Sequence, residues 1–275
     1  MDLNIEEFIK EAVKEDIGRG DLFARVAKSK EVSGYILAKS NGVFAGEEYI
    51  KAIGRLFNIE FNLNIKDSQT FKKGDILLTF RGDSKTILSV ERTILNITLH
   101  ASSIATLTRE FVDIIKPYNV KLLDTRKTRP LLRNLEKYAI RCGGGVNHRM
   151  GLDDCLMLKD THLKTIDNLK EFLVEVREKI PFTSKVEIEC ESFEDAKRAM
   201  EAKADIIMCD NMSIEEIKRV VEFRDKNYPY ILLEASGNVT LDTIEQIAKT
   251  GVDAISTGSS IHQAKWIDLS MKMDG

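Results

Sequence analysis

The spacing of apolar residues predicts a helix at the start of the chain and a set of short strands after it. From Glu6 to Lys14 apolar residues recur at helical intervals, and this pattern breaks at Gly18-Arg19-Gly20-Asp21. From Val32 to Asp83, short alternating segments are separated by Asn-Gly, Lys-Asp and Lys-Gly-Asp turns. This second pattern predicts mostly antiparallel strands, with one helix from about Glu48 to Leu56.

The remainder of the chain has the sequence pattern of a long helix followed by a parallel sheet. Apolar residues at helical intervals from Ile87 to Ile115 predict one long helix or two joined ones that link two domains. Beyond Pro117, apolar β-rich runs alternate with amphipathic helical stretches, which is typical of βα repeats. The candidate strands are 120–123, 155–158, 185–188, 205–208, 230–233 and 253–256. A complete eight-stranded barrel needs roughly 250 residues, so we predict an incomplete barrel of six or seven strands.

Each predicted strand of this barrel runs into charged or hydroxyl residues. These are Asp124-Thr125-Arg126-Lys127, Lys159-Asp160, Glu189, Asp210-Asn211, Glu234 with Ser236-Gly237-Asn238, and Ser256-Thr257-Gly258-Ser259. Small residues at such places often only cap the next helix. Long charged side chains such as Arg126 and Glu189 are not needed for caps. Because the strand ends of a parallel barrel meet at one mouth, we expect an active site there.

Basic residues gather in one segment of a slightly acidic chain. The sequence has 41 Lys and Arg against 44 Asp and Glu, a net charge of −3, which argues against a protein that wraps nucleic acid by bulk electrostatics. Residues 121–149 hold eight basic residues and two acidic ones, a local balance of +6, which predicts an anion site. Arg126, Lys127 and Arg149 are stronger candidates because loops at the mouth of the barrel carry them. We interpret Arg133 and Lys137 as solvated surface or as a subunit contact.

Three glycines in the same segment precede a histidine and an arginine. Gly143-Gly144-Gly145 does not directly follow a strand and lacks the spacing of a dinucleotide-binding loop. These glycines allow a tight turn and a close approach to a ligand, and they bring His148 and Arg149 to the basic strand end. For His148, a structural role and a ligand contact both stay open. The small residues of 236–238 and 257–259 suit phosphate binding at helix N-termini.

Cysteine spacing and hydropathy narrow the class of protein further. The four cysteines form no C-x-x-C pair, so neither a zinc ribbon nor a small disulfide scaffold is indicated, and we expect reduced thiols. The first residues are acidic and amphipathic, unlike a signal peptide, and no apolar run reaches the length of a membrane span. We therefore expect a cytoplasmic protein without a membrane or nucleic-acid partner.

Several motifs together resemble one enzyme family. They are EDIGRGD at 15–21, ERTILN at 91–96, DTRKTRP at 124–130, LEKYAIRCGGGVNHRMGL at 135–152, LKDTH at 158–162, VEIECE at 186–191, MCDN at 208–211 and LLEASGN at 232–238. In these stretches the sequence resembles nicotinate-nucleotide pyrophosphorylase, also called quinolinate phosphoribosyltransferase, and the match extends over nearly the whole chain.

The resemblance implies a fold, an assembly and a reaction. The fold would be an N-terminal α/β sandwich, residues 1–108 with 267–275 packing back on it, followed by a C-terminal open α/β barrel, residues 109–266. Two subunits would pair head to tail as a homodimer so that each covers its neighbour's site, and a hexamer stays open. The reaction would transfer phosphoribosyl from phosphoribosyl pyrophosphate (PRPP) to quinolinate with decarboxylation, giving nicotinate mononucleotide for NAD biosynthesis.

The family motifs also imply roles for individual residues. The quinolinate carboxylates would be held by Arg126, Arg149 and Lys159, with Thr125 and His148 alongside and Arg92 reaching in from the partner subunit. Arginine suits planar carboxylates because its guanidinium binds them through paired hydrogen bonds.

The same resemblance implies a PRPP site. Glu189 and Asp210 would face the ribose hydroxyls and the Mg²⁺ that PRPP carries, and Lys127 would lie between the substrates as a third catalytic group. Lys127 and Lys159 would also contact PRPP, and the phosphate would be held by Ser236, Gly237, Asn238, Thr257, Gly258 and Ser259. Because Mg²⁺ usually keeps few protein ligands, we expect it to bind mainly through PRPP.

Two departures and two alternatives accompany this resemblance. The family usually has Asn where Thr161 stands and Thr where Leu22 stands. A paralogous phosphoribosyltransferase of the same fold, using nicotinate or linked to molybdenum, is the nearest alternative, although four cationic residues favour a diacid. A non-catalytic RNA- or nucleotide-binding protein is the alternative from another class, and the net charge and the lack of an RNA-binding aromatic motif argue against it.

Overall fold

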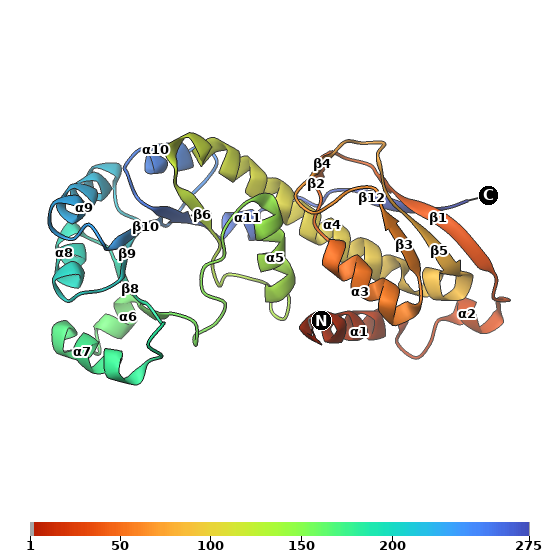
Figure 1. Ribbon diagram of the computed structural model, residues 1–275, viewed down its shortest axis with the longest axis horizontal. Coiled ribbons are helices and arrows are strands. Elements are labelled where there is room, and N and C mark those ends of the chain that lie inside the picture. Colours follow the sequence, from red (N-terminus) through yellow and green to blue (C-terminus); the bar gives the residue numbers. More distant parts are fainter. Residues whose placement is uncertain (1–2, 275) are drawn as a thin grey trace. The chain divides into compact units, whose positions relative to one another are not determined.

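The chain folds into two compact units in a computed structural model that describes residues 3–274 (Figure 1). The first unit contains the described residues up to Arg109, together with 134–144 and the residues from Ala264 onward. The second contains Glu110–Arg133 and Gly145–Gln263. Residues 134–144 therefore belong to the first unit, whereas we had placed them in the barrel domain.

The first unit is built on a four-stranded antiparallel sheet in the order β12-β1-β5-β3. The long central strands are β1 (Glu31–Ala38) and β5 (Ile76–Asp83), and β3 (Glu60–Leu63) and β12 (Leu269–Met273) are the edges. The alternating burial of β1 and β5 places Ile36, Leu78 and Phe80 in the core. The C-terminal segment thus completes the sheet of the N-terminal unit.

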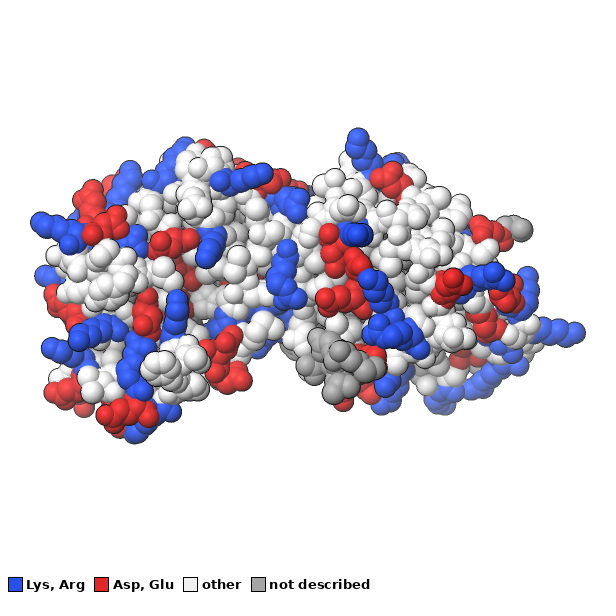
Figure 2. All heavy atoms as spheres, in the orientation of Figure 1, with Lys and Arg blue, Asp and Glu red and all other residues white. Residues whose placement is uncertain are grey.

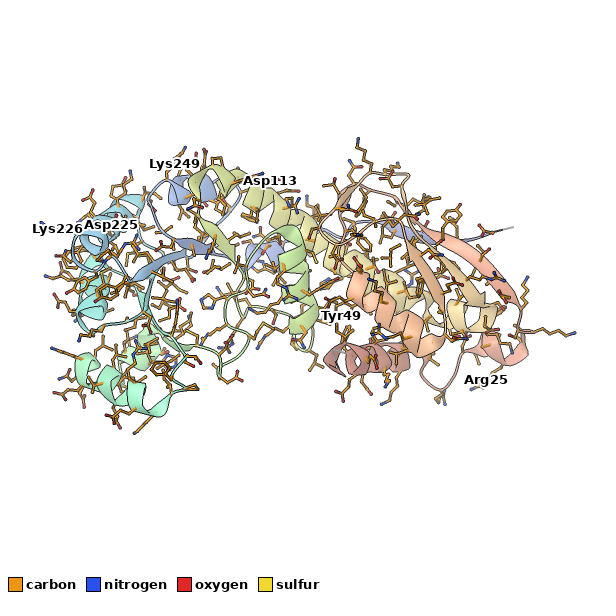
Figure 3. The ribbon with its side chains drawn as sticks, viewed as in Figure 1. Arg25, Tyr49, Asp113, Asp225, Lys226 and Lys249 are labelled. Atoms are coloured by element: carbon orange, nitrogen blue, oxygen red, sulfur yellow. The ribbon has the colours of Figure 1, made fainter. Side chains whose placement is uncertain are left out.

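Helices cover this sheet. They include α1 (Leu3–Ile17), α2 (Leu22–Val26) and α3 (Glu47–Phe57), and a small two-stranded sheet is formed by β2 (Gly42–Val43) and β4 (Thr70–Phe71). Helix α3, which carries Tyr49 (Figure 3), buries Tyr49, Ile50 and Ile53. The centroid of the Tyr49 ring lies 5.3 Å from that of the Tyr138 ring. Leu22, the residue that departs from the family pattern, is exposed on α2.

Helix α5 (Arg133–Gly143) explains why residues 134–144 pack in the first unit. Glu136 lies 3.0 Å from His100, and the Tyr138 hydroxyl donates a hydrogen bond to Asp67. Glu136 and Lys137 are both completely buried. The interpretation of Lys137 as surface or subunit contact was therefore wrong, because a charged residue can enter a core where polar neighbours surround it.

The linking segment is a single helix. Helix α4 runs from Ser84 to Ile115, 32 residues without a break, and a short 3₁₀ turn η1 (Lys116–Tyr118) follows where Pro117 prevents continuation. Its residues up to Arg109 belong to the first unit and the rest to the second. Of the two possibilities predicted for this segment, one long helix is correct.

The second unit is an open barrel of six parallel strands in the order β6-β11-β10-β9-β8-β7. The strands are β6 (Lys121–Leu123), β7 (Leu156–Leu158), β8 (Val186–Cys190), β9 (Ile206–Asp210), β10 (Leu232–Ser236) and β11 (Ala254–Ser256). Helices α6 (Asp160–Leu163), α7 (Leu169–Lys179), α8 (Phe193–Glu201), α9 (Ile214–Asn227), α10 (Ile244–Ala248) and α11 (Ser259–His262) alternate with them (Figure 1). The predicted fold class is confirmed.

The two edges of this barrel differ. Beside β6, Val146 makes a parallel bridge with Leu123, so the segment after α5 continues the sheet for one residue pair. At the other edge stands β7, paired only with β8 among the strands of the described chain. The sheet therefore stays open between residues 146 and 156.

Three barrel strands extend further than the hydrophobic pattern predicted. Glu189 lies within β8, Asp210 ends β9, and Glu234 lies in the middle of β10 rather than after it. The predicted strands ended at residues 188, 208 and 233, before Glu189, Asp210 and Glu234. In a barrel, however, inward-facing residues of a strand can be acidic where they meet a polar interior.

A buried arginine fixes the outer helix α9 to the sheet. Arg224 is 6% exposed, and its Nη1 donates to the carbonyl of Ile231 at 2.8 Å and to Asp253 at 2.7 Å. The neighbouring Asp225 and Lys226 lie on the outer side of α9 (Figure 3). Arg224 therefore ties α9 to the segments that precede β10 and β11.

Acidic and basic side chains are interspersed over the visible surface (Figure 2). This agrees with the small net charge of −3 and shows no single basic field on that face. Within the described residues, no helix combines the length and hydropathy that crossing a membrane requires.

Candidate active site

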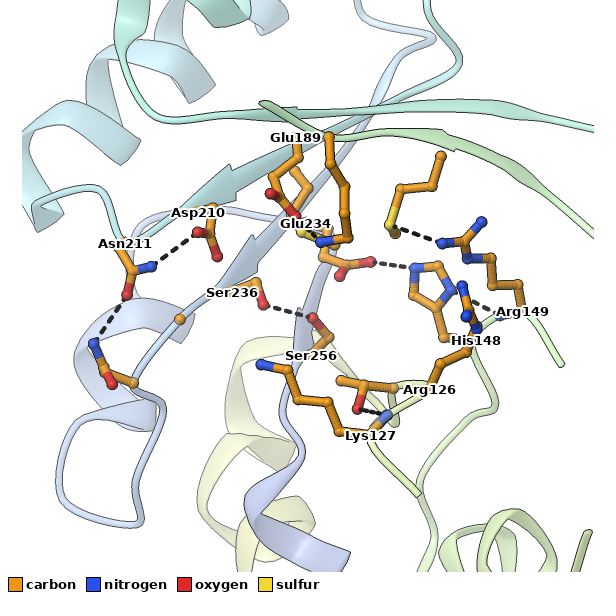
Figure 4. Close-up of a pocket in the computed structure, with 16 residues that line it drawn as sticks. Arg126, Lys127, His148, Arg149, Glu189, Asp210, Asn211, Glu234, Ser236 and Ser256 are labelled. Carbon is orange, nitrogen blue, oxygen red and sulfur yellow. Dashed lines mark hydrogen bonds and ion pairs between the residues drawn. The ribbon is translucent and has the colours of Figure 1, made fainter. Parts of the chain in front are cut away.

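A pocket of about 480 Å³ lies at the carboxyl ends of the barrel strands (Figure 4). Its lining consists of polar and charged residues with two methionines: Thr125, Arg126, Lys127, His148, Arg149, Met157, Lys159, Glu189, Met208, Asp210, Asn211, Glu234, Ser236, Gly237, Asn238 and Ser256. All of them belong to the second unit. The strand-end residues singled out in the sequence thus meet at one mouth, as a parallel barrel requires.

Most of the cationic lining comes from the loops that follow β6 and α5, and Lys159 follows β7. The Thr125 hydroxyl accepts a hydrogen bond from the Lys127 backbone N–H at 3.0 Å, which turns the loop that carries Arg126 and Lys127. The pKa of Arg149 is lowered, first by burial and then by the like charge of Arg126. Two guanidinium groups that repel each other in this way are stabilised by an anion between them.

Arg149 also crosses the open side of the barrel. Its Nη1 donates to the Cys155 carbonyl at 3.0 Å, and its Nη2 lies 3.4 Å from the Met157 sulfur. A guanidinium has five N–H donors, so three remain for a ligand. These two contacts hold the Arg149 side chain in one orientation, and the remaining N–H groups can bind a carboxylate through paired hydrogen bonds.

Lys159 and Glu189 form an ion pair inside the pocket. Lys159 comes directly after β7 and Glu189 lies near the end of β8, so the pair joins neighbouring strand ends. The Lys159 side chain is 44% exposed and that of Glu189 is 11% exposed. A ligand anion can therefore reach Lys159, whereas Glu189 is placed to accept hydrogen bonds from a more deeply bound group.

Asp210 is connected to the loop after β10 through Asn211. The Asn211 amide nitrogen donates to Asp210 at 2.8 Å, and the Asn211 amide oxygen accepts from Asn238 at 3.0 Å. Asn211, directly after β9, and Asn238 have positive φ, 52° and 49°, and Gly237, which joins β10 to Asn238, has a φ of 95°. A Cβ at Gly237 would overlap with the Asn211 amide, so this position needs glycine.

The loop after β11 lies differently from the expectation. The pocket lining includes Ser256, whose hydroxyl donates to Ser236 at 3.1 Å. Thr257, Gly258 and Ser259 are not among the lining residues, and the Ser259 hydroxyl donates instead to the Val239 carbonyl at 3.1 Å. A Cβ at Gly258 would lie 3.4 Å from the Lys127 side chain. Their part in phosphate binding stays a prediction.

Beneath the cationic loops, His148 meets two buried glutamates. Its Nε2 lies 3.0 Å from Glu187 and 3.3 Å from Glu234, whose residues are 0% and 2% exposed. Burial by itself would lower the pKa of His148, but the two carboxylates raise it to about 10. The Arg149 backbone N–H lies 2.7 Å from Nδ1 and opposes a proton there.

Asp124 fixes the loop that carries His148. Its carboxylate is completely buried and accepts hydrogen bonds from the Asn147 side chain at 2.5 Å and the His148 backbone N–H at 2.9 Å. The aspartate that opens the DTRKTRP motif therefore holds the histidine loop against β6. His148 therefore has two positions to fill: it lines the pocket, and it also contacts the two buried glutamates.

The pocket gathers most of the predicted site residues. Eleven of them line it, which are Thr125, Arg126, Lys127, His148, Arg149, Lys159, Glu189, Asp210, Ser236, Gly237 and Asn238. Arg92 lies on α4 in the first unit and is exposed. Its contribution from a partner subunit stays a prediction, as do the individual roles of the gathered residues.

Five further residues of the pocket, Asn211 among them, were not predicted as site residues. Met157 and Met208 form apolar walls that suit a planar ring, and Ser256 and Glu234 complete the floor. Glu234 had been noted only as a strand-end residue. The sequence does hold one signal for acidic residues inside the barrel. In VEIEC, Glu187 and Glu189 are two positions apart and therefore face the same side of β8.

Comparison with known proteins gives one consistent result. The chain matches the family models described as "Quinolinate phosphoribosyl transferase, N-terminal domain" over residues 21–102 and "Quinolinate phosphoribosyl transferase, C-terminal domain" over residues 104–272. The "Probable nicotinate-nucleotide pyrophosphorylase [carboxylating]" of Methanothermobacter thermautotrophicus is 39% identical, covering 98% of this chain and 99% of the relative. The Synechocystis protein of the same name is 37% identical, covering 98% and 92%.

A solved structure agrees with the sequence comparison. The nicotinate-nucleotide pyrophosphorylase from Francisella tularensis superimposes with a TM-score of 0.90 at 34% identity, covering 98% of this chain and 96% of the other. The fold and the polar mouth of the barrel thus define an enzyme of the two-domain phosphoribosyltransferase type. The chain belongs to the quinolinate phosphoribosyltransferase family.

Proposed function

We propose that the chain transfers phosphoribosyl from PRPP to quinolinate and releases pyrophosphate and carbon dioxide, with nicotinate mononucleotide as the product. The observation that carries this proposal is the pocket itself, which brings Arg126, Arg149 and Lys159 together opposite Asp210 and the 236–238 loop. The cations suit a planar diacid, and the acidic and small residues suit a ribose phosphate.

The proposed chemistry follows from this separation of charges. As pyrophosphate leaves, the anomeric carbon of the ribose gains positive character, which Glu189 and Asp210 are placed to stabilise. The pyridine nitrogen of quinolinate attacks that carbon. The ring becomes positively charged and can then accept the electrons that the adjacent carboxylate leaves behind. Lys127, between the two groups of residues, would orient both substrates.

The pocket also fits the magnesium that PRPP carries. Asp210 and Glu189 offer carboxylate oxygens on one wall, which are the ligands Mg²⁺ prefers, and few protein ligands are needed when phosphate supplies the others. Bound there, the ion would neutralise charge on the departing pyrophosphate.

The decisive assay supplies purified protein with PRPP, magnesium and either quinolinate or nicotinate. Release of carbon dioxide and nicotinate mononucleotide from quinolinate supports the proposal, and Arg126→Ala is expected to reduce this turnover strongly. Consumption of nicotinate with quinolinate left untouched would favour the paralogous enzyme instead. Salt-dependent RNA binding without turnover of PRPP would favour the non-catalytic alternative.

We further propose a homodimer whose active sites are shared, with Arg92 supplied by the partner. Arg92 is exposed on α4, so it is available to another subunit. A mixture of Arg92→Ala and Arg126→Ala proteins tests this. If the site is shared, half of the mixed dimers are heterodimers with one intact site each, so activity returns to about a quarter of the wild-type level. No recovery after subunit exchange would contradict a shared site.

The cell compartment is part of the same proposal. The described cysteines are free, and Cys142, Cys190 and Cys209 are buried, which suits a reducing cytoplasm.

Sedimentation analysis of the purified protein distinguishes a dimer from a hexamer.

A further inference from the structure

Glu234 occupies an unusual position at the floor of the pocket. It lies in the middle of β10, is 2% exposed and yet lines the pocket, with its carboxyl group beside His148 (Figure 4). One of its oxygens, Oε1, has no hydrogen-bond partner among the residues that the structure describes. A buried polar atom without a partner is costly, so the group is arranged for something other than stability.

The neighbours of Glu234 favour its protonated form. Burial raises its pKa, His148 opposes this, and the second carboxylate of Glu187 raises it further. The other groups facing it are the Ser256 hydroxyl and the buried Cys209 thiol, which carries no positive charge. His148 therefore faces both buried carboxylates, whereas the charge of Arg149 acts on Glu187, so of the two groups it is Glu234 whose protonated form is favoured.

The proposed reaction needs such a proton. When carbon dioxide leaves the ring carbon next to the quaternised nitrogen, the electron pair of the broken C–C bond stays on that carbon. The product carries hydrogen at this position, so an acid in the pocket or a water molecule must supply a proton. This step rests on the proposed function.

We propose that Glu234 is the acid that protonates the ring carbon after decarboxylation. The C–C bond breaks with its electrons left on carbon, the Glu234 O–H bond breaks, and a C–H bond forms, which leaves Glu234 as a carboxylate. That carboxylate recovers its proton from solvent after the product departs. Glu234 is the member of the buried pair that lines the pocket, whereas Glu187 contacts His148 without lining it.

The test compares Glu234→Gln with Glu187→Gln. Glutamine has the size and the neutral charge of a protonated glutamate but cannot donate an acidic proton, so Glu234→Gln keeps the packing. We expect its kcat for carbon dioxide release to fall about 10²- to 10⁴-fold, the usual contribution of a general acid, with the KM for quinolinate little changed. Glu187→Gln removes an equally buried partner of His148 and is expected to raise KM with less than about a tenfold loss of kcat.

The outcomes separate this inference from the proposed function. Wild-type protein that fails to convert quinolinate overturns the proposed function, and with it the premise of this step. Active wild type with a Glu234→Gln variant that keeps kcat within about tenfold overturns the inference alone, as does an equal loss in Glu187→Gln.

The pH profile of the wild type provides a measurement that needs no variant. Because Glu234 must be protonated to act, kcat is expected to fall as pH rises through its raised pKa. A kcat that shows no such fall at any alkaline pH at which the protein stays folded would overturn the inference even if Glu234→Gln did not fold.

Discussion

Replacing Arg149 by lysine tests whether the cationic wall recognises a carboxylate by its shape. Arg149 donates to the Cys155 carbonyl at 3.0 Å and to the Met157 sulfur at 3.4 Å, which leaves three donors in a fixed plane for a ligand. Lysine keeps the positive charge but has one nitrogen, which cannot hold the Cys155 carbonyl and also bind a carboxylate through two parallel bonds. Arg149→Lys should therefore keep the positive charge but lose the paired hydrogen bonds to the carboxylate.

The expected magnitude follows from one lost charge-assisted hydrogen bond. Such a bond contributes about 1.5–3 kcal/mol, which corresponds to a rise of about 10- to 150-fold in the KM for quinolinate. The KM for PRPP should change little, because the residues expected to bind it lie elsewhere in the pocket. Steady-state kinetics with each substrate varied in turn measures both values.

Arg133 provides a matched control for this substitution. Its guanidinium also donates to a backbone carbonyl, that of Met150 at 2.9 Å, but the residue does not line the pocket. Arg133→Lys should therefore leave both KM values within about twofold of wild type. An unchanged KM for quinolinate in Arg149→Lys, or an equal rise for PRPP, would show that Arg149 does not bind the diacid as a fork.

Two other perturbations address the phosphate loop and the buried histidine. Gly237→Ala would force a Cβ onto the Asn211 amide at a φ of 95°, so the KM for PRPP should rise at least tenfold and the free energy of unfolding should fall by about 1–3 kcal/mol; Gly74→Ala, at a φ of 99° with no atom within 4 Å, keeps the backbone strain without the overlap and should leave that KM unchanged. The pKa of His148 is raised from 6.5 to about 10, so its charge stabilises the fold fully below about pH 6.5, and this contribution is lost as pH rises through 10. Urea unfolding from pH 6 to about pH 10.5 should show a smaller decline in His148→Gln than in wild type, and equal declines would show that the Arg149 N–H, which opposes a proton on Nδ1, keeps His148 neutral.

The sequence carried enough information for the architecture of the barrel but not for its interior. The βα alternation predicted six or seven parallel strands, and the described residues form six, because apolar strands separated by amphipathic helices have few other packings. The residues after each strand were predicted to converge for the same reason. The single helix α4 also followed from an uninterrupted pattern that ends at Pro117.

The errors concern charged residues in buried places. Lys137 is completely buried although its segment is strongly basic, because α5 packs within the first unit. Glu187 is completely buried within a strand that was predicted, and Glu234 lies inside β10, which the hydrophobic pattern ended at residue 233. Burial of a charge depends on partners from distant segments, such as His148 for both glutamates, and no local pattern reveals those partners.

Arg149 belongs both to the open edge of the parallel sheet and to the expected binding site for the diacid. Arg149 follows the Val146 bridge to β6 and reaches the carbonyl just before β7, so it spans the break in the sheet. An anion that immobilises Arg149 would therefore also restrain β7. Slower hydrogen exchange at the Leu156 amide, which bonds the Lys185 carbonyl at 3.1 Å, would then report occupancy even when no turnover takes place.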